Sequence, residues 1–162
     1  MNSQKILLTI LIILIFGNFI FLVNYFKPNF TGKVIENSDD FGEIVFITKV
    51  IDGDTVVANG ESIRLLGMDS DERGYPCYKE AKKRLEELIL DKEVRLETGN
   101  EDRDYYNRLL RYIFFDDKNI NIQLVEEGLA VARFYKDKKY KKEILNAEKN
   151  SRLNKIGCKW EN

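Results

Sequence analysis

An uncharged apolar segment near the start of the chain restricts its fold more than any other feature. Residues 6–26 read ILLTILIILIFGNFIFLVNYF, with Lys5 before them and Lys27 after them. As a helix, this segment would be about 31 Å long, enough to cross the hydrocarbon core of a bilayer. A core helix of a water-soluble domain would carry polar residues on one face. The segment therefore predicts a single transmembrane anchor preceded by a short tail, residues 1–5.

A cleaved signal peptide is the alternative interpretation of this segment. Signal peptides have a shorter apolar core and a cleavage site of small residues, and no Ala-x-Ala sequence follows residue 26. The short tail and the single anchor favour a cytoplasmic N-terminus and a domain on the extracytoplasmic side, whereas signal cleavage would release a secreted protein. Residues 27–42, which include Pro28 and Gly32, are expected to form a polar linker to a domain spanning residues 43–162.

Residues 43–162 carry the patterns of a small β domain. Alternating and β-branched stretches predict five strands, at residues 44–50, 54–58, 61–67, 92–98 and 109–115. Asn59-Gly60 marks a tight hairpin between the second strand and the third. Helical spacing of apolar residues and a closing basic stretch predict helices at residues 77–90, 121–127 and 138–155, with loops at residues 68–76 and 99–107. This order matches an α+β, mainly β fold: a five-stranded OB-type barrel with three helices.

The composition excludes several kinds of chemistry. The chain has no histidine and only two cysteines, which excludes a Ser-His-Asp triad, imidazole-ligated zinc, a zinc ribbon and an iron–sulfur cluster. Residues 133–159 carry 10 Lys or Arg against 3 Asp or Glu, whereas residues 31–132 carry 14 against 23. The net charge is −1, so any nucleic-acid binding would occur at a local site. The basic helix is expected to be a solvated face, with DNA contact as the alternative.

Two carboxylate clusters are candidates for a metal site. One is Asp52-Gly53-Asp54-Thr55, between the first two strands, and the other is Asp69-Ser70-Asp71-Glu72, after the third. Carboxylates and carbonyls suit Ca²⁺, although Asp and Gly are also ordinary turn residues. Arg64 precedes the second cluster and Arg108 begins the last strand. Because a guanidinium can hold two phosphate oxygens at once, this combination suits a phosphodiester-cleaving site without histidine.

Several separated motifs resemble the staphylococcal nuclease, or thermonuclease, family. They agree with the family in order and spacing, and together they span residues 44–160. The motifs are VIDGDTV (50–56), IRLLGMDSDE (63–72), DYYNRLLRYIF (104–114), NIQLVEEGLA (121–130) and GCKW (157–160). The fold of that family is an OB-type barrel with three helices, as the strand and helix patterns predict independently.

The resemblance implies a calcium site. Asp54 and Asp69 match the side-chain ligands of the ion, and Ser70 stands where a threonine supplies a backbone carbonyl. Asp52 is similar to a carboxylate in the outer shell of the metal. The implied cofactor is therefore Ca²⁺.

The resemblance also implies catalytic and substrate-binding residues. Glu72 matches the glutamate that orients or deprotonates the attacking water, and Arg64 and Arg108 match the arginines that bind the phosphate and stabilise its transition state. Tyr106 matches a tyrosine that hydrogen-bonds the terminal phosphate of the nucleotide. Tyr135 falls near tyrosines that line the nucleotide pocket.

Three positions depart from the family pattern. Asp71 replaces a proline, so the metal loop loses a residue with fixed φ and gains a negative charge, which we expect to strengthen ion binding and weaken phosphate binding. Asn107 replaces a glycine, a mild change because Asn tolerates left-handed conformations. The stretch GLAVARFYK (128–136) is one residue shorter than in the best-known member, which leaves the base-stacking aromatic open between Phe134 and Tyr135.

Cys77 and Cys158 are expected to form a disulfide. They are the only cysteines, and an exported domain would lie in an oxidising compartment. The resemblance makes the pairing plausible, because in the nuclease fold the segment after the last helix packs near the start of the first. Two buried thiols in a cytosolic domain are the alternative.

The sequence therefore predicts a membrane-anchored, calcium-dependent nuclease. Its substrate would be DNA, and also RNA, cleaved by a metal-associated water to leave 3′-phosphates, as the resemblance implies. Its other partner would be the lipid bilayer, through residues 6–26. Two alternatives remain: a non-catalytic OB-type nucleic-acid-binding module tethered to the membrane, and an anchored calcium-binding structural domain. The complete set of carboxylates and arginines argues against the first, and the two arginines argue against the second.

Overall fold

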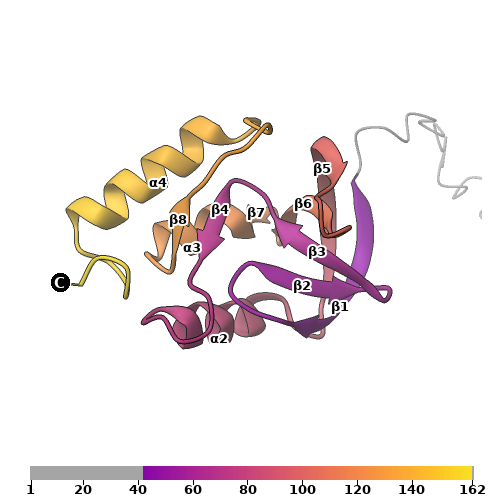
Figure 1. The fold of residues 1–162 in the computed structure, drawn as a ribbon, viewed down its shortest axis with the longest axis horizontal. Helices are drawn as coiled ribbons and strands as arrows, with labels where there is room; N and C mark the ends of the chain where they lie inside the picture. Colours follow the sequence, from indigo (N-terminus) through magenta and orange to yellow (C-terminus); the bar gives the residue numbers. More distant parts are fainter. Residues whose placement is uncertain (1–41, 162) are drawn as a thin grey trace, which may run out of the picture. The chain divides into compact units, whose positions relative to one another are not determined.

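The computed structural model describes residues 42–161 (Figure 1). The tail predicted at residues 1–5, the anchor at residues 6–26 and the linker at residues 27–41 lie outside that range. Between residues 42 and 161, no helix combines the length and the apolar character needed to cross a bilayer.

The described part of the chain alternates short strands with three helices. Their order is β1 (Glu43–Val50), β2 (Thr55–Ala58), β3 (Glu61–Leu65), β4 (Met68–Ser70), α2 (Tyr78–Ile89), β5 (Glu93–Arg103), β6 (Leu109–Phe115), β7 (Lys118–Asn119), α3 (Ile120–Glu126), β8 (Ala130–Ala132) and α4 (Lys141–Leu153).

Five of these strands close into a barrel, which confirms the OB-type fold. β1, β2 and β3 form an antiparallel meander, and β5 pairs antiparallel with β1 on one side and with β6 on the other. The parallel pairing of β3 with β6 closes the ring, with Arg64 opposite Leu110. β7 extends the sheet from β6, while β4 and β8 form a separate two-stranded ribbon beside α3 (Figure 1).

The predicted element boundaries were wrong at several places, among them the third strand, which ends at Leu65 rather than at residue 67. The expected loop at residues 68–76 begins with β4, and the expected loop at residues 99–107 is strand up to Arg103. The last helix begins at Lys141 rather than at residue 138. Strands of two or three residues, such as β4, β7 and β8, are too short to show alternation, so they depend on their pairing partners rather than on local pattern.

The core lies inside the barrel and under the helices. Alternate residues of β1 are buried, among them Val45 and Ile47. α2 covers the barrel with Ala81, Leu85 and Ile89, which lie one turn apart and therefore share one face of the helix. Because α2 packs on the barrel, the position of its first residue is fixed. The segment from Ser70 to Cys77 leads into α2, so its end is fixed as well.

A buried asparagine connects the helical part of the domain to the barrel. The amide of Asn121 donates hydrogen bonds to the carbonyls of Leu66, at 2.9 Å, and Arg111, at 3.2 Å, and its oxygen accepts one from the N–H of Ile113. Asn121 is fully buried, so an unpaired amide here would cost about 1–3 kcal/mol. The interaction holds the end of β3 against β6, where the chain leaves the barrel toward β4.

The segment after α4 returns to the start of α2 and is tied there covalently. Cys77 and Cys158 form the expected disulfide, with Cα atoms 5.4 Å apart. The N–H of Lys159 donates to the carbonyl of Gly128. Gly128 has a φ of +65°, and a Cβ at this position would lie 1.7 Å from the carbonyl oxygen of Ile156. Only glycine allows so close an approach of the two backbone segments.

We predict that removing this disulfide destabilises the domain substantially. The bond joins residues 81 positions apart, and closing a loop of that size restricts the unfolded chain by up to about 4 kcal/mol. Urea unfolding of Cys77→Ser/Cys158→Ser against the wild type measures the difference. Thiol titration of the denatured, unreduced wild type is the control, and two reactive thiols would contradict the bond.

An ion pair between α2 and the end of α3 also joins distant parts of the chain. The guanidinium of Arg84 donates to both carboxylate oxygens of Glu127, at 2.7 and 2.8 Å. Burial alone would raise the pKa of Glu127, but the bonds from Arg84 and Gln123 outweigh it and leave that pKa below its ordinary value of 4.5. The pair therefore stabilises the fold above pH 4.5, and this contribution is lost as the pH falls through the lowered pKa.

Replacing Arg84 with Met should reduce stability at neutral pH and have progressively less effect in acid. Both side chains are about one-third exposed, so solvent screening limits the loss to about 1 kcal/mol. Chemical unfolding at a series of pH values measures it. Lys83→Met is the matched control, since Lys83 contacts only Glu87 on the surface. A constant difference between wild type and Arg84→Met down to strongly acidic pH would refute the linkage.

Candidate active site

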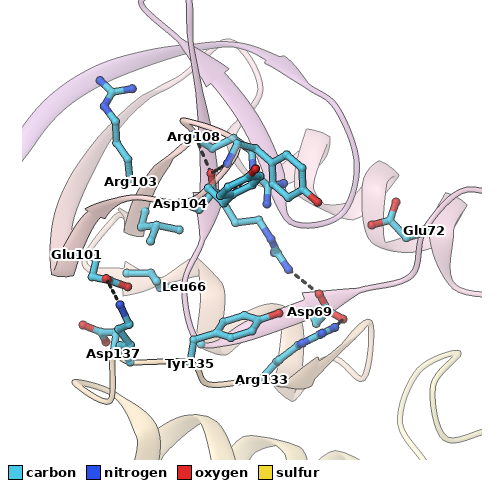
Figure 2. Close-up of a pocket in the computed structure, with 16 residues that line it drawn as sticks. Leu66, Asp69, Glu72, Glu101, Arg103, Asp104, Arg108, Arg133, Tyr135 and Asp137 are labelled. Atoms are coloured by element: carbon cyan, nitrogen blue, oxygen red, sulfur yellow. Dashed lines mark hydrogen bonds and ion pairs between the residues drawn. The ribbon is translucent and has the colours of Figure 1, made fainter.

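A cavity of about 590 Å³ opens where the barrel meets the loop before α4 (Figure 2). It is lined by residues from the ends of β3 and β4, the turn between β5 and β6, and the segment 133–137. Six residues that the sequence singled out lie around it: Arg64, Asp69, Glu72, Tyr106, Arg108 and Tyr135. The fold therefore collects in one place residues that are up to 71 positions apart in the chain.

The pairing of the barrel strands sets the positions of the two arginines. Arg64 lies opposite Leu110 on β6, and Arg108 stands directly before that strand. On its other side, Arg64 is in register with Thr55 of β2. Arg108 reaches the same threonine, with its Nη1 3.4 Å from the Thr55 hydroxyl. Backbone pairing thus fixes Arg64 at one wall of the cavity, and Arg108 reaches the same wall from the turn that leads into β6.

Asp54 is a buried carboxylate with every oxygen engaged. Its Oδ1 accepts from the hydroxyl of Thr55 at 3.0 Å and lies 2.9 Å from the guanidinium of Arg64. Its Oδ2 accepts from the N–H and the hydroxyl of Ser70, at 2.8 and 2.9 Å. Burial raises the pKa of the Asp54 carboxyl above its ordinary value of 3.8, against the opposite effect of Arg64.

Asp69 lies between two arginines. Its Oδ1 is 2.5 Å from the Nη2 of Arg64, and its Oδ2 is 2.6 Å from the Nη1 of Arg133 (Figure 2). Arg64 therefore bridges Asp54 and Asp69, with one nitrogen on each carboxylate. The two carboxylates predicted to hold a metal ion are close together, and the positive charge between them is a guanidinium.

The donors around Arg64 fit a hard cation in type. Two carboxylates converge on one positive group, and carboxylate oxygens are the ligands that Ca²⁺ prefers. Over residues 42–161, no group of three Asp, Glu, Cys or His side chains forms a metal-binding cluster. A calcium ion would therefore need backbone carbonyls and water to complete its shell, as calcium sites commonly do.

Ser70 and Asp52 support the carboxylates from outside. Ser70 contacts Asp54 through its N–H and hydroxyl, and the carbonyl ligand predicted at this residue stays a prediction. The Oδ1 of Asp52 accepts a hydrogen bond of 3.1 Å from the N–H of Asp54 and thereby fixes the turn between β1 and β2. Within residues 42–161, this backbone contact is the hydrogen bond that links the Asp52 side chain to Asp54, and the outer-shell role expected for Asp52 stays a prediction.

Arg108 is oriented by Asp104, the first residue of the motif DYYNRLLRYIF (104–114). Asp104 accepts from the Nε of Arg108 at 2.7 Å and from its backbone N–H at 2.9 Å. Burial by itself would raise the pKa of Asp104, but these bonds outweigh it and keep that pKa below its ordinary value. Asn107, which replaces the usual glycine, has a φ of +64°, a conformation that Asn tolerates.

Glu72 and two tyrosines line the open side of the cavity. Glu72 is exposed, and no hydrogen bond or ion pair engages its carboxylate within the described residues. The rings of Tyr106 and Tyr135 are 77% and 72% exposed, so both can contact a ligand. Phe134 packs against the core instead, which identifies Tyr135 as the aromatic residue that faces the cavity.

Arg133 is a site residue that the sequence analysis missed. It pairs with Asp69, lines the cavity and lies 5.4 Å from the ring of Tyr135. Its position two residues before Tyr135 was an available signal, because alternate residues of an extended segment share one face. Arg103 lines the cavity as well, so four arginines surround it rather than the two that the sequence indicated.

A second missed residue, Asp137, anchors the segment that carries Arg133 and Tyr135. Asp137 accepts hydrogen bonds from the Tyr112 hydroxyl at 2.5 Å, and from the backbone N–H groups of Asn100 at 2.7 Å and Lys139 at 3.0 Å. Asp137 is buried, so these three donors satisfy a charge that would otherwise be costly. They hold the segment against β5 and β6.

Asp71 does not act as a free negative charge beside the predicted metal site. Its Oδ1 pairs with the ammonium of Lys159, and its Oδ2 accepts the N–H of Cys77 at 3.0 Å. Lys159 therefore neutralises much of the charge that the replacement of proline introduced. Asp71 is not among the residues that line the cavity, although its neighbour Glu72 is.

Comparison with known proteins gives consistent matches. Residues 62–162 match the family described as staphylococcal nuclease homologue. The chain is 33% identical over 145 residues to a thermonuclease of Staphylococcus intermedius, covering 82% of this chain and 86% of that protein. It is 32% identical over 127 residues to a thermonuclease of Staphylococcus hyicus, covering 72% and 75%. It is 35% identical over 125 residues to the endonuclease YncB of Bacillus subtilis, covering 69% and 59%.

Proposed function

Because this chain belongs to the staphylococcal nuclease family, we propose that it is a calcium-dependent endonuclease tethered to a membrane. Its relatives include proteins named thermonuclease and endonuclease. The reaction is hydrolysis of phosphodiester bonds, and the substrate is DNA, with RNA as a second substrate. The observation that carries the proposal is the meeting of Arg64, Arg108, Asp69 and Glu72 around one cavity.

The two arginines suit the phosphoryl group that such a reaction attacks. Each guanidinium carries a permanent charge and can donate two hydrogen bonds to phosphate oxygens. Negative charge builds up on those oxygens in the transition state, and donors already in place stabilise it without reorganisation. Asp104 holds Arg108, so this donor is preorganised, whereas the barrel pairing holds the backbone of Arg64 while its guanidinium contacts Asp54 and Asp69.

The carboxylates divide into two roles. Asp54 and Asp69, together with the carbonyl of Ser70, would hold Ca²⁺, and the ion, when bound, would neutralise a phosphate oxygen and favour ionisation of water. Binding of the ion and the substrate requires Arg64 to exchange its contacts with Asp54 and Asp69 for a contact with the phosphate. Glu72, whose carboxylate is free of protein contacts in the described part of the chain, acts as the general base.

Tyr106 and Tyr135, which both line the cavity, bind the nucleotide. Exposed rings can stack on any base, and a phenol can donate a hydrogen bond to a phosphate. Neither interaction distinguishes one base from another, so sequence specificity should be weak. The net charge of the chain gives no general attraction to nucleic acid, so binding depends on this cavity.

The anchor at residues 6–26 places the nuclease on the extracytoplasmic side of a membrane. The support for this is the length and apolar character of that segment, together with the disulfide, a bond typical of oxidising compartments. A protein released after signal cleavage would also encounter an oxidising environment, so fractionation decides between the two forms.

The test is a plasmid-nicking assay on membrane and soluble fractions from cells that express the full chain. We expect activity in the membrane fraction with Ca²⁺, loss of activity with excess chelator, and poor replacement by Mg²⁺, which demands a stricter octahedral geometry. Full activity in chelator would contradict the metal requirement, and activity only in the medium would contradict the anchor. Binding of DNA without cleavage would indicate the non-catalytic module instead.

Substitutions of the two reacting groups should affect turnover more than affinity. We expect Glu72→Gln to lower kcat by about 10²–10⁴-fold, as loss of a general base does. Arg108→Lys should lower kcat by about 10²–10³-fold, because a single ammonium cannot reproduce a bidentate contact. Steady-state kinetics measure both.

Glu126→Gln and Arg152→Lys are the matched controls for these substitutions. Both residues are exposed on helices away from the cavity, at the end of α3 and in α4. The controls should have wild-type kinetics. Comparable rates in the site variants and the controls would mean that Glu72 and Arg108 have been assigned wrongly.

A further inference from the structure

The position of Glu72 depends entirely on its backbone. Within the described residues no partner engages its carboxylate, and the segment from Glu72 to Pro76 is exposed throughout. That segment contains Gly74 with a φ of +99° and only one internal backbone hydrogen bond from Tyr75, of 3.1 Å to the carbonyl of Glu72. Something outside the segment must hold it, because a general base acts only from a fixed distance to its substrate.

Asp71 closes this segment at both ends. It stands directly before Glu72, and its Oδ2 accepts the N–H of Cys77, the residue that begins α2. The residues between them are thereby held as a loop of fixed ends. The other oxygen of Asp71 pairs with the ammonium of Lys159. Both side chains are only 17% exposed, so the pair is screened less than an ordinary surface ion pair.

The partner of Asp71 is itself fixed by the rest of the fold. Lys159 follows Cys158, which is bonded to Cys77, and its N–H donates to the carbonyl of Gly128. The disulfide therefore joins the start of α2 to Cys158, and the ion pair joins Asp71, six residues before Cys77, to the next residue, Lys159. All of these contacts converge on the two ends of the segment that carries Glu72.

We propose that Asp71 and Lys159 form a clamp that positions Glu72, and that the Cys77–Cys158 disulfide holds the clamp closed, so that nuclease activity depends on the redox state of the chain. This inference rests on the proposed function. Asp71 and Lys159 are positioning residues, since neither lines the cavity. The clamp does by side-chain contacts what a proline at residue 71 would do by fixing φ.

The clamp predicts a defect in turnover rather than in substrate binding. Glu72 acts in the transition state, whereas Arg64, Arg108 and the tyrosines hold the substrate, so a displaced Glu72 lowers kcat and leaves KM unchanged. Loss of a group that orients a reacting residue commonly costs about 10–100-fold. We expect an effect of that size in Asp71→Ala, which loses both contacts.

Three further variants of the full-length chain in mild detergent separate the two contacts. Asp71→Asn keeps an acceptor for the N–H of Cys77 and loses the ion pair, and Lys159→Met loses the ion pair alone. Both should reduce kcat less than Asp71→Ala does. Lys149→Met is the matched control, since it removes the same charge from an exposed position of α4 and should have the wild-type kcat.

Combination with Glu72→Gln distinguishes positioning from a general structural role. If Asp71 acts through Glu72, Asp71→Ala added to Glu72→Gln lowers kcat no further, because residues that act as a unit are not additive. An equal fractional loss of kcat in both backgrounds would overturn the proposal, as would a wild-type kcat in Asp71→Ala. The melting curve of Lys159→Met serves as a check that the domain remains folded.

The dependence of activity on the disulfide is tested with the wild type and with the variant that lacks both cysteines. Each protein is treated with a thiol reductant, and the reductant is removed before the assay. This treatment should lower the kcat of the wild type and leave the kcat of Cys77→Ser/Cys158→Ser unchanged. Equal kcat for oxidised and reduced wild type would overturn the redox part. Circular dichroism of the reduced protein shows whether the domain is still folded, and a loss of kcat that follows unfolding alone would also overturn it.

Hydrogen exchange tests the clamp without relying on cleavage. The amide of Cys77 should exchange faster in Asp71→Ala than in the wild type, whereas amides of the barrel strands should be unaffected. If the wild type shows no cleavage at all, the proposed nuclease function fails, and this exchange rate still decides whether Asp71 holds the loop. Unchanged protection of Cys77 would overturn the clamp.

Discussion

The parallel pairing of β3 with β6 is the contact on which the rest of the structure depends. It joins β3 and β6, the two outer strands of the antiparallel order β3-β2-β1-β5-β6, and so turns an open sheet into a closed barrel. The same register sets Arg64 beside the strand that Arg108 begins. The pairing that closes the barrel therefore also brings the two arginines together, and a shift of register would separate the arginines and expose the core.

Local pattern predicted the barrel because its strands are long enough to alternate and are separated by strong turn signals. The Asn59-Gly60 turn, with φ of +52° and +79°, is an example: its backbone conformation is encoded by the two residues themselves. β4 and β8 could not be found in this way, since each has three residues and is stable only because the other lies beside it. Their pairing is a tertiary property, and it places Asp69 next to the segment of Arg133.

The same distinction applies to the site. Motifs with conserved spacing identified the carboxylates, the two arginines and the tyrosines as candidates, because each motif is local. Ion pairs between distant segments could not be predicted from local motifs. Arg133 pairs with Asp69, 64 positions away in the chain, and Lys159 pairs with Asp71, 88 positions away. The sequence also indicated the negative charge of Asp71 but not its partner Lys159. The expected effect of Asp71 on the predicted metal site therefore left out the positive charge that pairs with it. Long-range electrostatic partners can be assigned only after the fold is known.

The bond between Cys77 and Cys158 makes most of the domain a covalent ring. Everything from the start of α2 to the end of α4 lies between the two sulfurs, including the exposed turn at Tyr105 and Tyr106. A protease that cuts the backbone once anywhere in that stretch leaves two pieces joined through sulfur. The barrel strands and the segment of Arg133 would therefore stay on one molecule, and a nicked domain would keep its fragments where a chain with free thiols would release them.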